Sequence, residues 1–248
     1  MPKGLRLAGL GLRFEGREMK RRTFIKALGG MAGLVLAPAI SAMPVPRSPY
    51  VKIAFVGLGG AGGRIVSKLA SDGPARWGDS DAHVELYAID TDRRSLDYTS
   101  DRVRRILLPG FPSGSMGSCI YPQYARQAAW HHRDKFSGIW NRQGLPHEPI
   151  IIVVAGFGRG AGTGLAQALS WQARQYTNFT WPMLSMPLSR EVHAISIPEE
   201  MRRMERATDN SLALFYPDES NVNETVAATI EKVDQQIIND LQGMFSTY

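Results

Sequence analysis

Two stretches of the chain carry glycine at a spacing that could bind an anion. One reads IIIVVAGFGRGAGTG over residues 150–164, where an apolar run leads into glycine at every second position from Gly156 to Gly164. The other reads GLGGAGG over residues 57–63 and follows the apolar run YVKIAFV. Glycine permits positive φ and leaves backbone N–H groups unshielded, so an anion can reach them and the start of a following helix. Each stretch therefore predicts a phosphate-binding loop.

The order of apolar segments indicates the fold that would hold these loops. Strands are expected over residues 50–56, 84–89, 103–108, 150–154, 181–187 and 212–216, and helices over residues 64–73, 93–98, 124–143, 165–176, 197–207 and 223–244. The alternation predicts an α/β fold with a doubly wound, mostly parallel sheet of the Rossmann-like type. Ligands of such sheets lie beyond the carboxyl ends of the strands where the winding reverses. If the first and fourth strands flank that point, both glycine loops line one crevice.

The net charge of the chain is concentrated in its first residues. The whole chain has 29 Lys/Arg and 23 Asp/Glu, of which residues 1–42 hold eight and two, so the remaining basic and acidic residues balance. The body therefore gives no electrostatic reason to expect a nucleic-acid partner. The single cysteine, Cys119, excludes an intramolecular disulfide and a multi-cysteine metal site. Four tryptophans, Trp130, Trp140, Trp171 and Trp181, are expected to fill the core or an interface.

Five motifs, in order, resemble those of the tubulin/FtsZ GTPase superfamily over roughly residues 51–243. They are the first glycine loop, Asp90-Thr91-Asp92 after the second strand, the loop SMGSCIYP over residues 115–122, the second glycine loop over residues 158–164, and Tyr216-Pro217-Asp218 before the last helix. The resemblance implies a nucleotide-binding domain that takes GTP or GDP, with or without Mg²⁺. Guanine nucleotide is then the expected small-molecule partner.

The resemblance assigns nucleotide binding to residues in six parts of the chain, and it assigns no catalytic residue and no metal ligand. Glu231 matches the acid that reads guanine in the family. The full set is Gly57, Gly59, Gly60, Gly62, Gly63, Arg64, Asp90, Asp92, Gly117, Gly156, Gly158, Arg159, Gly160, Ala161, Gly162, Thr163, Gly164, Asp218 and Glu231.

The chain also departs from the family pattern. Arg64 stands where FtsZ usually has Asn, Arg159 and Ala161 alter the signature loop, and Val226 aligns with the aromatic residue that flanks the base. The chain ends at Tyr248, where the family continues into an acidic loop that completes hydrolysis and into a second domain. We therefore expect a domain that binds nucleotide, does not complete GTP hydrolysis alone, and acts through assembly or a partner.

The last helix is the expected contact for a homo-oligomer or a protein partner. With no second domain to cover it, an apolar face would be left open. Its residues recur at helical spacing and are Val226, Ile230, Val233, Ile237, Ile238 and Leu241.

The segment over residues 19–42 resembles a twin-arginine export signal. Arg21 and Arg22 precede Thr-Phe-Ile-Lys, an apolar run follows, and small residues near Ala39 offer a cleavage site. The expected organisation is a signal over residues 1–42, a linker over 43–50, the nucleotide-binding domain over 51–222, and the central helix with the chain end over 223–248. Export of the folded protein to the periplasm follows, with its nucleotide loaded beforehand. An uncleaved membrane anchor stays open, as does a start at Met1 or Met19.

Two other functions fit parts of the pattern. Gly57-x-Gly59-x-x-Gly62 after a strand, with Asp90 or Asp92 after the next, is compatible with an exported Rossmann-type NAD(P)-dependent oxidoreductase. The third interpretation is a module of the same fold that binds no nucleotide and serves only protein interaction. Neither glycine loop ends in Gly-Lys-Ser/Thr, which argues against a P-loop NTPase.

Overall fold

Six parallel strands form the middle layer of the protein. The structure is a computed structural model that describes residues 51–72, 82–109, 121–141, 144–189, 196–209, 212–220 and 223–245. The strands are β1 (Val51–Leu58), β2 (Ala82–Asp90), β3 (Arg104–Leu107), β4 (Ile150–Gly156), β5 (Thr180–Ser185) and β6 (Ala213–Phe215). Their order in the sheet is β3-β2-β1-β4-β5-β6. The winding therefore reverses between β1 and β4, which confirms the expected doubly wound topology.

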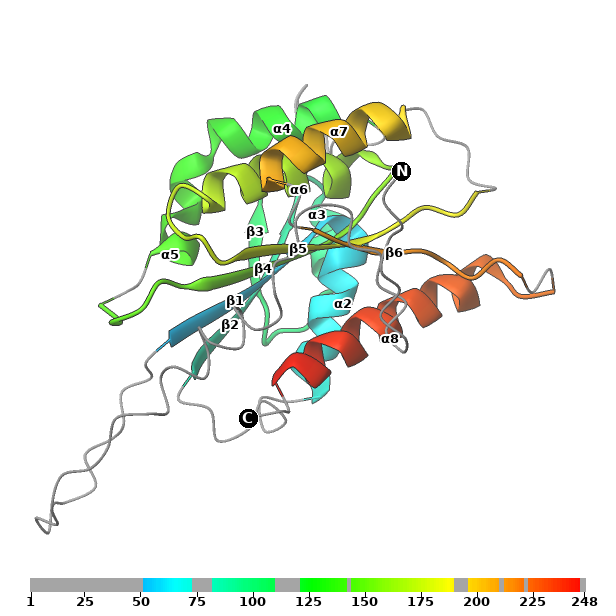
Figure 1. Cartoon of the computed structure of the whole chain (residues 1–248), viewed down its shortest axis with the longest axis horizontal. Helices are drawn as coiled ribbons and strands as arrows, with labels where there is room; N and C mark the ends of the chain where they lie inside the picture. Colours follow the sequence, from blue (N-terminus) through cyan, green and yellow to red (C-terminus); the bar gives the residue numbers. More distant parts are fainter. Residues whose placement is uncertain are drawn as a thin grey trace, which may run out of the picture.

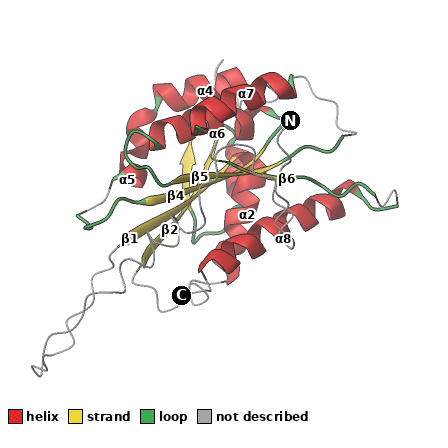
Figure 2. Ribbon diagram, viewed as in Figure 1, coloured by secondary structure: helices red, strands yellow, loops and turns green. Residues whose placement is uncertain are grey.

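Helices cover both faces of this sheet (Figures 1 and 2). On one face lie α4 (Pro122–His131), α6 (Gly160–Ala173) and α7 (Ile197–Thr208), and on the other lie α2 (Gly59–Asp72) and α8 (Val226–Phe245). Shorter helical segments are α3 (Arg93–Asp97), η2 (Arg133–Phe136) and α5 (Ser137–Trp140). Two buried clusters result, one on each face, because alternate residues of a strand point to opposite sides. Along β1, Val56 belongs to the first cluster and Phe55 to the second.

Both long helices that follow the glycine stretches begin earlier than the sequence pattern predicts. α2 begins at Gly59 and α6 at Gly160, so most of the expected loop residues form the first turn of each helix. Glycine disfavours a helix intrinsically, and tertiary contacts override that preference here. β1 runs directly into α2, and only Phe157 to Arg159 separate β4 from α6.

One further expectation about the helices is wrong in detail. The helix predicted over 124–143 is divided after His131 into α4, η2 and α5, and this division places Phe136 and Trp140 in the buried core. Ser196 is the N-cap of α7, but its side chain makes no capping hydrogen bond. Its backbone carbonyl instead accepts from the N–H groups of Glu199 and Glu200.

The last helix does not present the open apolar face that the sequence suggested. Val233, Ile237, Ile238 and Leu241 are at most 3% exposed and belong to the second core cluster. Of the other two, Ile230 is half-buried and Val226 is 43% exposed. The expectation is wrong because α8 packs on the sheet itself, beside α2, and needs no second domain to cover these residues.

Candidate functional site

The two glycine stretches meet at the point where the winding of the sheet reverses. β1 and β4 are hydrogen-bonded neighbours, with Leu58 opposite Ala155. A Cβ built on Gly59 would lie 2.8 Å from the amide nitrogen of Gly162, and one on Gly156 would lie 2.8 Å from the Cβ of Ala61. The starts of α2 and α6 therefore touch each other at this point of the sheet.

Both stretches also pack tightly against β4. A Cβ on Gly62 would lie 2.2 Å from the carbonyl oxygen of Val154, and a Cβ on Gly162 would lie 2.2 Å from that of Gly156. Real Cβ atoms do not come so close to oxygen, so neither position can hold a larger residue without a shift of the backbone. Glycine is required at these positions by packing as well as by any ligand.

Two positions need glycine for its backbone conformation. Gly59 has a φ of 67° and Gly158 a φ of 104°, both in the region that residues with a side chain rarely adopt. The N–H of Gly158 donates to the hydroxyl of Thr163, 2.9 Å away, and Thr163 is fully buried. Thr163 thereby fixes the turn that leads from β4 into α6.

The two helix starts determine the electrostatic character of this region. α2 and α6 have 14 residues each, and neither carries an acid in its first turn. The first N–H groups of a helix have no partner within the helix and bear a partial positive charge. Gly60 and Arg159 are exposed at these starts, Ala61 and Ala161 are half-buried, and Gly160 is buried. The arrangement can hold an anion against two helix N-termini.

The two acids after β2 have structural partners. Asp90 is 2% exposed, and its carboxylate accepts hydrogen bonds from the N–H groups of Thr91 (2.6 Å) and Asp92 (3.1 Å). Burial raises the pKa of the Asp90 carboxyl, although these bonds and one from Ser95 oppose the rise. Asp92 is the N-cap of α3 and accepts from the N–H of Arg94. Both carboxylates organise the turn beside the crevice.

Arg64 points to the last helix. Its Nε lies 2.6 Å and its Nη2 3.2 Å from the two carboxylate oxygens of Asp234, a side chain with no exposed surface. One turn further along α2, Lys68 lies 2.6 Å from Glu231 and 3.5 Å from Asp234. Three ion pairs thus join α2 to α8. Arg64, which the resemblance assigned to nucleotide binding, has a carboxylate partner in the structure, and Glu231 has Lys68 as its partner.

The remaining candidate site residues lie around the two helix starts or among residues that the structure does not describe. Gly63 approaches Thr99, and Gly164 packs against the carbonyl oxygen of Pro122 in α4. Asp218, fully exposed after β6, accepts from the N–H of Ser220, and this bond lowers the pKa of its carboxyl. Gly117 lies outside the described residues.

Some residues of this region were not found by sequence reasoning. Asp234 is the partner of Arg64 but is 170 positions away, and no local pattern marks it. Ser95 lies beside Gly60, where a Cβ would be 3.7 Å from its hydroxyl oxygen. Nothing in the sequence around Ser95 indicates that it lies beside Gly60.

One protein family matches most of the chain. Residues 52–225 match the family described as Tubulin/FtsZ family, GTPase domain. The chain belongs to this family. Cell division protein FtsZ of Aquifex aeolicus is 24% identical over 201 residues, covering 79% of this chain and 51% of that protein. FtsZ of Methanothermobacter thermautotrophicus is 29% identical over 140 residues, covering 56% and 33%. The chain thus spans about half or less of the length of these relatives.

Solved structures of the family share the fold. An empty FtsZ dimer of M. jannaschii superposes with a TM-score of 0.64 at 22% identity, covering 79% of this chain and 54% of that one. The GDP-bound monomer of CetZ1 from Haloferax volcanii gives 0.62 at 20% identity, covering 79% and 61%. The sheet order and the helices on both faces are therefore those of the family's nucleotide-binding domain.

Among the described residues there is neither a membrane-spanning helix nor a cluster of metal ligands. None of the described helices is long and apolar enough to cross a membrane. Within the same part of the chain, no group of three or more His, Cys, Asp or Glu side chains is arranged to hold a metal ion.

Proposed function

We propose that the crevice between the starts of α2 and α6 binds the phosphates of GTP or GDP. The observation that carries the proposal is the contact between Gly59 and Gly162, which brings two helix N-termini to one place at the switch point of the sheet. Membership of the Tubulin/FtsZ family supports guanine as the base. Glu231 is then the residue that accepts hydrogen bonds from the guanine ring, in exchange for its ion pair with Lys68.

We further propose that this domain does not turn GTP over by itself. A general base must reach the proton it removes. Of the candidate carboxylates, Asp90 and Asp92 are bonded to backbone N–H groups beside the crevice, and Asp218 is bonded to that of Ser220. Steady GTP turnover by the purified protein alone would overturn this part of the proposal and leave nucleotide binding intact.

A substitution at Gly60 tests the phosphate site directly. Gly60 is exposed in the first turn of α2, and a Cβ there has room, so Gly60→Asp can fold. Its carboxylate stabilises the helix start but repels phosphate. We expect calorimetry to show at least a tenfold loss of GTP affinity in Gly60→Asp, while Gly60→Asn, matched in size, keeps most of the binding.

Mass spectrometry of the natively purified protein identifies the ligand independently. GTP or GDP in the sample supports the proposal. NAD(P) would support the oxidoreductase instead, and an empty site that also fails to take up added GTP would support the interaction module. Equal GTP binding by Gly60→Asp and the unchanged protein would show that α2 does not hold the phosphates.

We also propose that residues 19–42 direct the folded protein to the periplasm by the twin-arginine route. The segment lies outside the described residues, and the support is its sequence, Arg21-Arg22 before Thr-Phe-Ile-Lys. Cell fractionation should find the protein in the periplasm and find the Arg21→Lys/Arg22→Lys variant in the cytoplasm. Lys20→Arg is the matched control that should still be exported, and export of both variants would contradict the proposal.

A further inference from the structure

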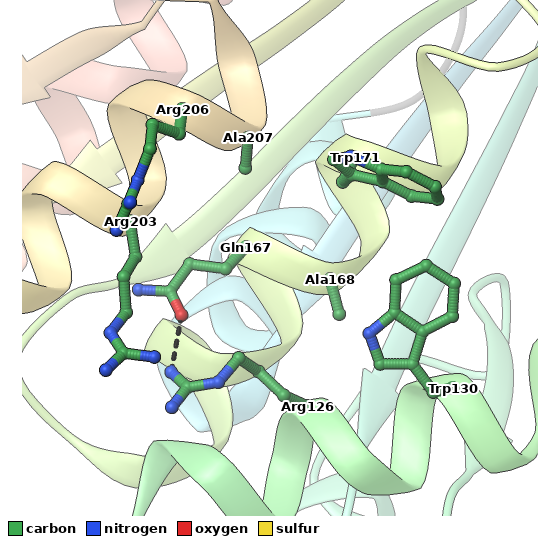
Figure 3. A pocket seen from close by; sticks show the side chains of 8 residues that line it. All are labelled: Arg126, Trp130, Gln167, Ala168, Trp171, Arg203, Arg206 and Ala207. Atoms are coloured by element: carbon green, nitrogen blue, oxygen red, sulfur yellow. Dashed lines mark hydrogen bonds between the residues drawn. The ribbon is translucent and has the colours of Figure 1, made fainter.

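An open groove lies on the helical face formed by α4, α6 and α7, away from the glycine stretches. It has a volume of about 230 Å³. Its floor comes from Gln167 and Ala168 of α6, with Trp130 of α4 on one wall and Arg203 of α7 on the other (Figure 3). Gln167 is seven positions past the first residue of α6, which places it about 10 Å along the helix from the crevice.

Two tryptophan rings form one end of the groove. Trp130 is 41% and Trp171 44% exposed, and their ring centroids are 5.0 Å apart at an interplanar angle of 60°. They point into the groove from neighbouring helices (Figure 3). Exposed tryptophans grouped in this way are typical of surfaces that bind another molecule.

Arginine supplies all the charged side chains that line the groove. Arg126 is held by Glu200 (2.7 Å) and Gln167 (2.6 Å), and Arg203 by Glu199 (2.6 Å). Arg206 donates to the backbone carbonyl of Arg202, and among the described residues no carboxylate lies within ion-pair distance of it.

The groove therefore combines two features along its length. An apolar aromatic end lies beside a rim of guanidinium groups. Two carboxylates pair with these arginines: Glu200, which is 8% exposed and does not line the groove, and Glu199, which pairs with Arg203. Guanidinium groups pair with carboxylates in a planar, two-bonded geometry and tryptophan faces receive aromatic rings. A short segment with acidic residues next to an aromatic residue would fit this surface.

We propose that the groove is the docking site for an acidic peptide segment of a partner protein. An aromatic side chain of the segment packs against Trp130 and Trp171, and its carboxylates pair with Arg206 and Arg203. The volume is about that of one large side chain with part of its backbone. This surface is separate from the nucleotide crevice, so the inference does not depend on the proposed function.

A titration of the full-length protein with synthetic peptides tests the inference. The probe is acetyl-Glu-Asp-Phe-Glu-Asp-amide, followed by tryptophan fluorescence and calorimetry. Replacing Phe by Ala, or the acids by Gln and Asn, removes one feature at a time. We expect each replacement to weaken binding about tenfold, since both features contribute. The Trp130→Phe/Trp171→Phe variant should lose the fluorescence response.

Charge reversal on the protein gives a matched pair of variants. Arg206→Glu should lower the affinity for the acidic peptide about tenfold. Arg133→Glu, the same change at an exposed residue of η2 that does not line the groove, should bind as the unchanged protein does. Circular dichroism and thermal unfolding must show both variants folded, and Arg203→Gln is the second variant if Arg206→Glu fails to fold.

Three results would overturn the inference. One is equal binding of the acidic peptide and its Gln/Asn counterpart, and another is equal weakening by Arg206→Glu and Arg133→Glu. The third is self-association in light scattering that Arg206→Glu abolishes, because the occupant would then be a second copy of the chain.

Discussion

The backbones of Gly59 and Gly162 are in direct contact, with 2.8 Å between a Cβ built on Gly59 and the amide nitrogen of Gly162. The first residue of α2 and the third residue of α6 thus meet beyond the ends of β1 and β4. Neither position has space for a side chain, because Gly162 lies against Gly59 and the Gly156 carbonyl lies against Gly162, so the approach of the two helix starts depends on glycine.

Substitution of Gly162 by Ala should destabilise the protein. The new methyl group would meet the Gly156 carbonyl oxygen at 2.2 Å, and relief requires α6 to move away from β4. We expect a loss of about 1–3 kcal/mol in the free energy of unfolding, measured with urea. Gly243→Ala is the control, because a Cβ there meets nothing within 4 Å. A stability unchanged by Gly162→Ala would contradict the packing described.

Substitution of Arg64 by Ala should be costly because it removes the main partner of a buried carboxylate. Asp234 has no exposed surface, and among the described residues the ion-pair partner it would keep is Lys68, 3.5 Å away. Since Arg64 is 42% exposed, we expect a loss of about 1–3 kcal/mol, less than for a fully buried pair. Asp101→Ala, at the exposed end of the Arg105 pair, should leave stability unchanged. Equal effects of the two substitutions would argue against the pair between α2 and α8.

The fold was largely predictable and the site only in part. Val56 and Val153 stand in apolar runs that mark strands, and the rules for parallel sheets then place these strands side by side. The start of each helix was not predictable, because the intrinsic preference of glycine opposes a helix and only contacts such as that of Gly62 with Val154 decide it. The role of Arg64 depends on Asp234, far away in the sequence, and no local rule supplies such a pair.

Glu85 should matter for stability in acid. Burial alone would raise the pKa of its carboxyl, but hydrogen bonds from Lys52 and Tyr87 outweigh it and the pKa is lowered. A lowered pKa means that this contribution to stability is present above the ordinary value of 4.5 and is lost as the pH falls through the folded value. In Glu85→Gln, the free energy of unfolding should therefore fall less as the pH is lowered from 7 to 3, measured by urea unfolding.

The same substitution should also lower stability at neutral pH. Lys52 has no exposed surface and lies 2.5 Å from Glu85, so the amide would remove the counter-charge that the described residues give its ammonium group. We expect a loss of about 3 kcal/mol at pH 7. Asp97→Asn, at an exposed position of α3, should change nothing. A neutral result for Glu85→Gln would show that the hydrogen bond from Lys52 to the Gly138 carbonyl is sufficient.

Asp90 should give the opposite dependence on pH. Burial raises the pKa of its carboxyl above the ordinary 3.8, so the folded state binds the proton more tightly than the unfolded state. Its contribution to stability then falls as the pH rises from 3.8 through the folded value. Asp90→Asn keeps an oxygen that accepts from Thr91 and Asp92. The variant should be at least as stable as the unchanged protein at pH 7 in urea unfolding, and a large loss would show that the carboxylate charge is needed.

The central position of β1 affects how the chain reaches its folded state during synthesis. Ile53 pairs with Val84 on one side and with Ile150 on the other, so the second neighbour is made 97 positions later. Parallel pairing over such a separation is slow, because a long loop must close first. Until β4 emerges from the ribosome, one edge of β1 exposes unpaired backbone groups and apolar side chains to other chains. The nascent protein is therefore most prone to aggregate before residues 150–156 are made, and a chaperone bound to this edge would protect it.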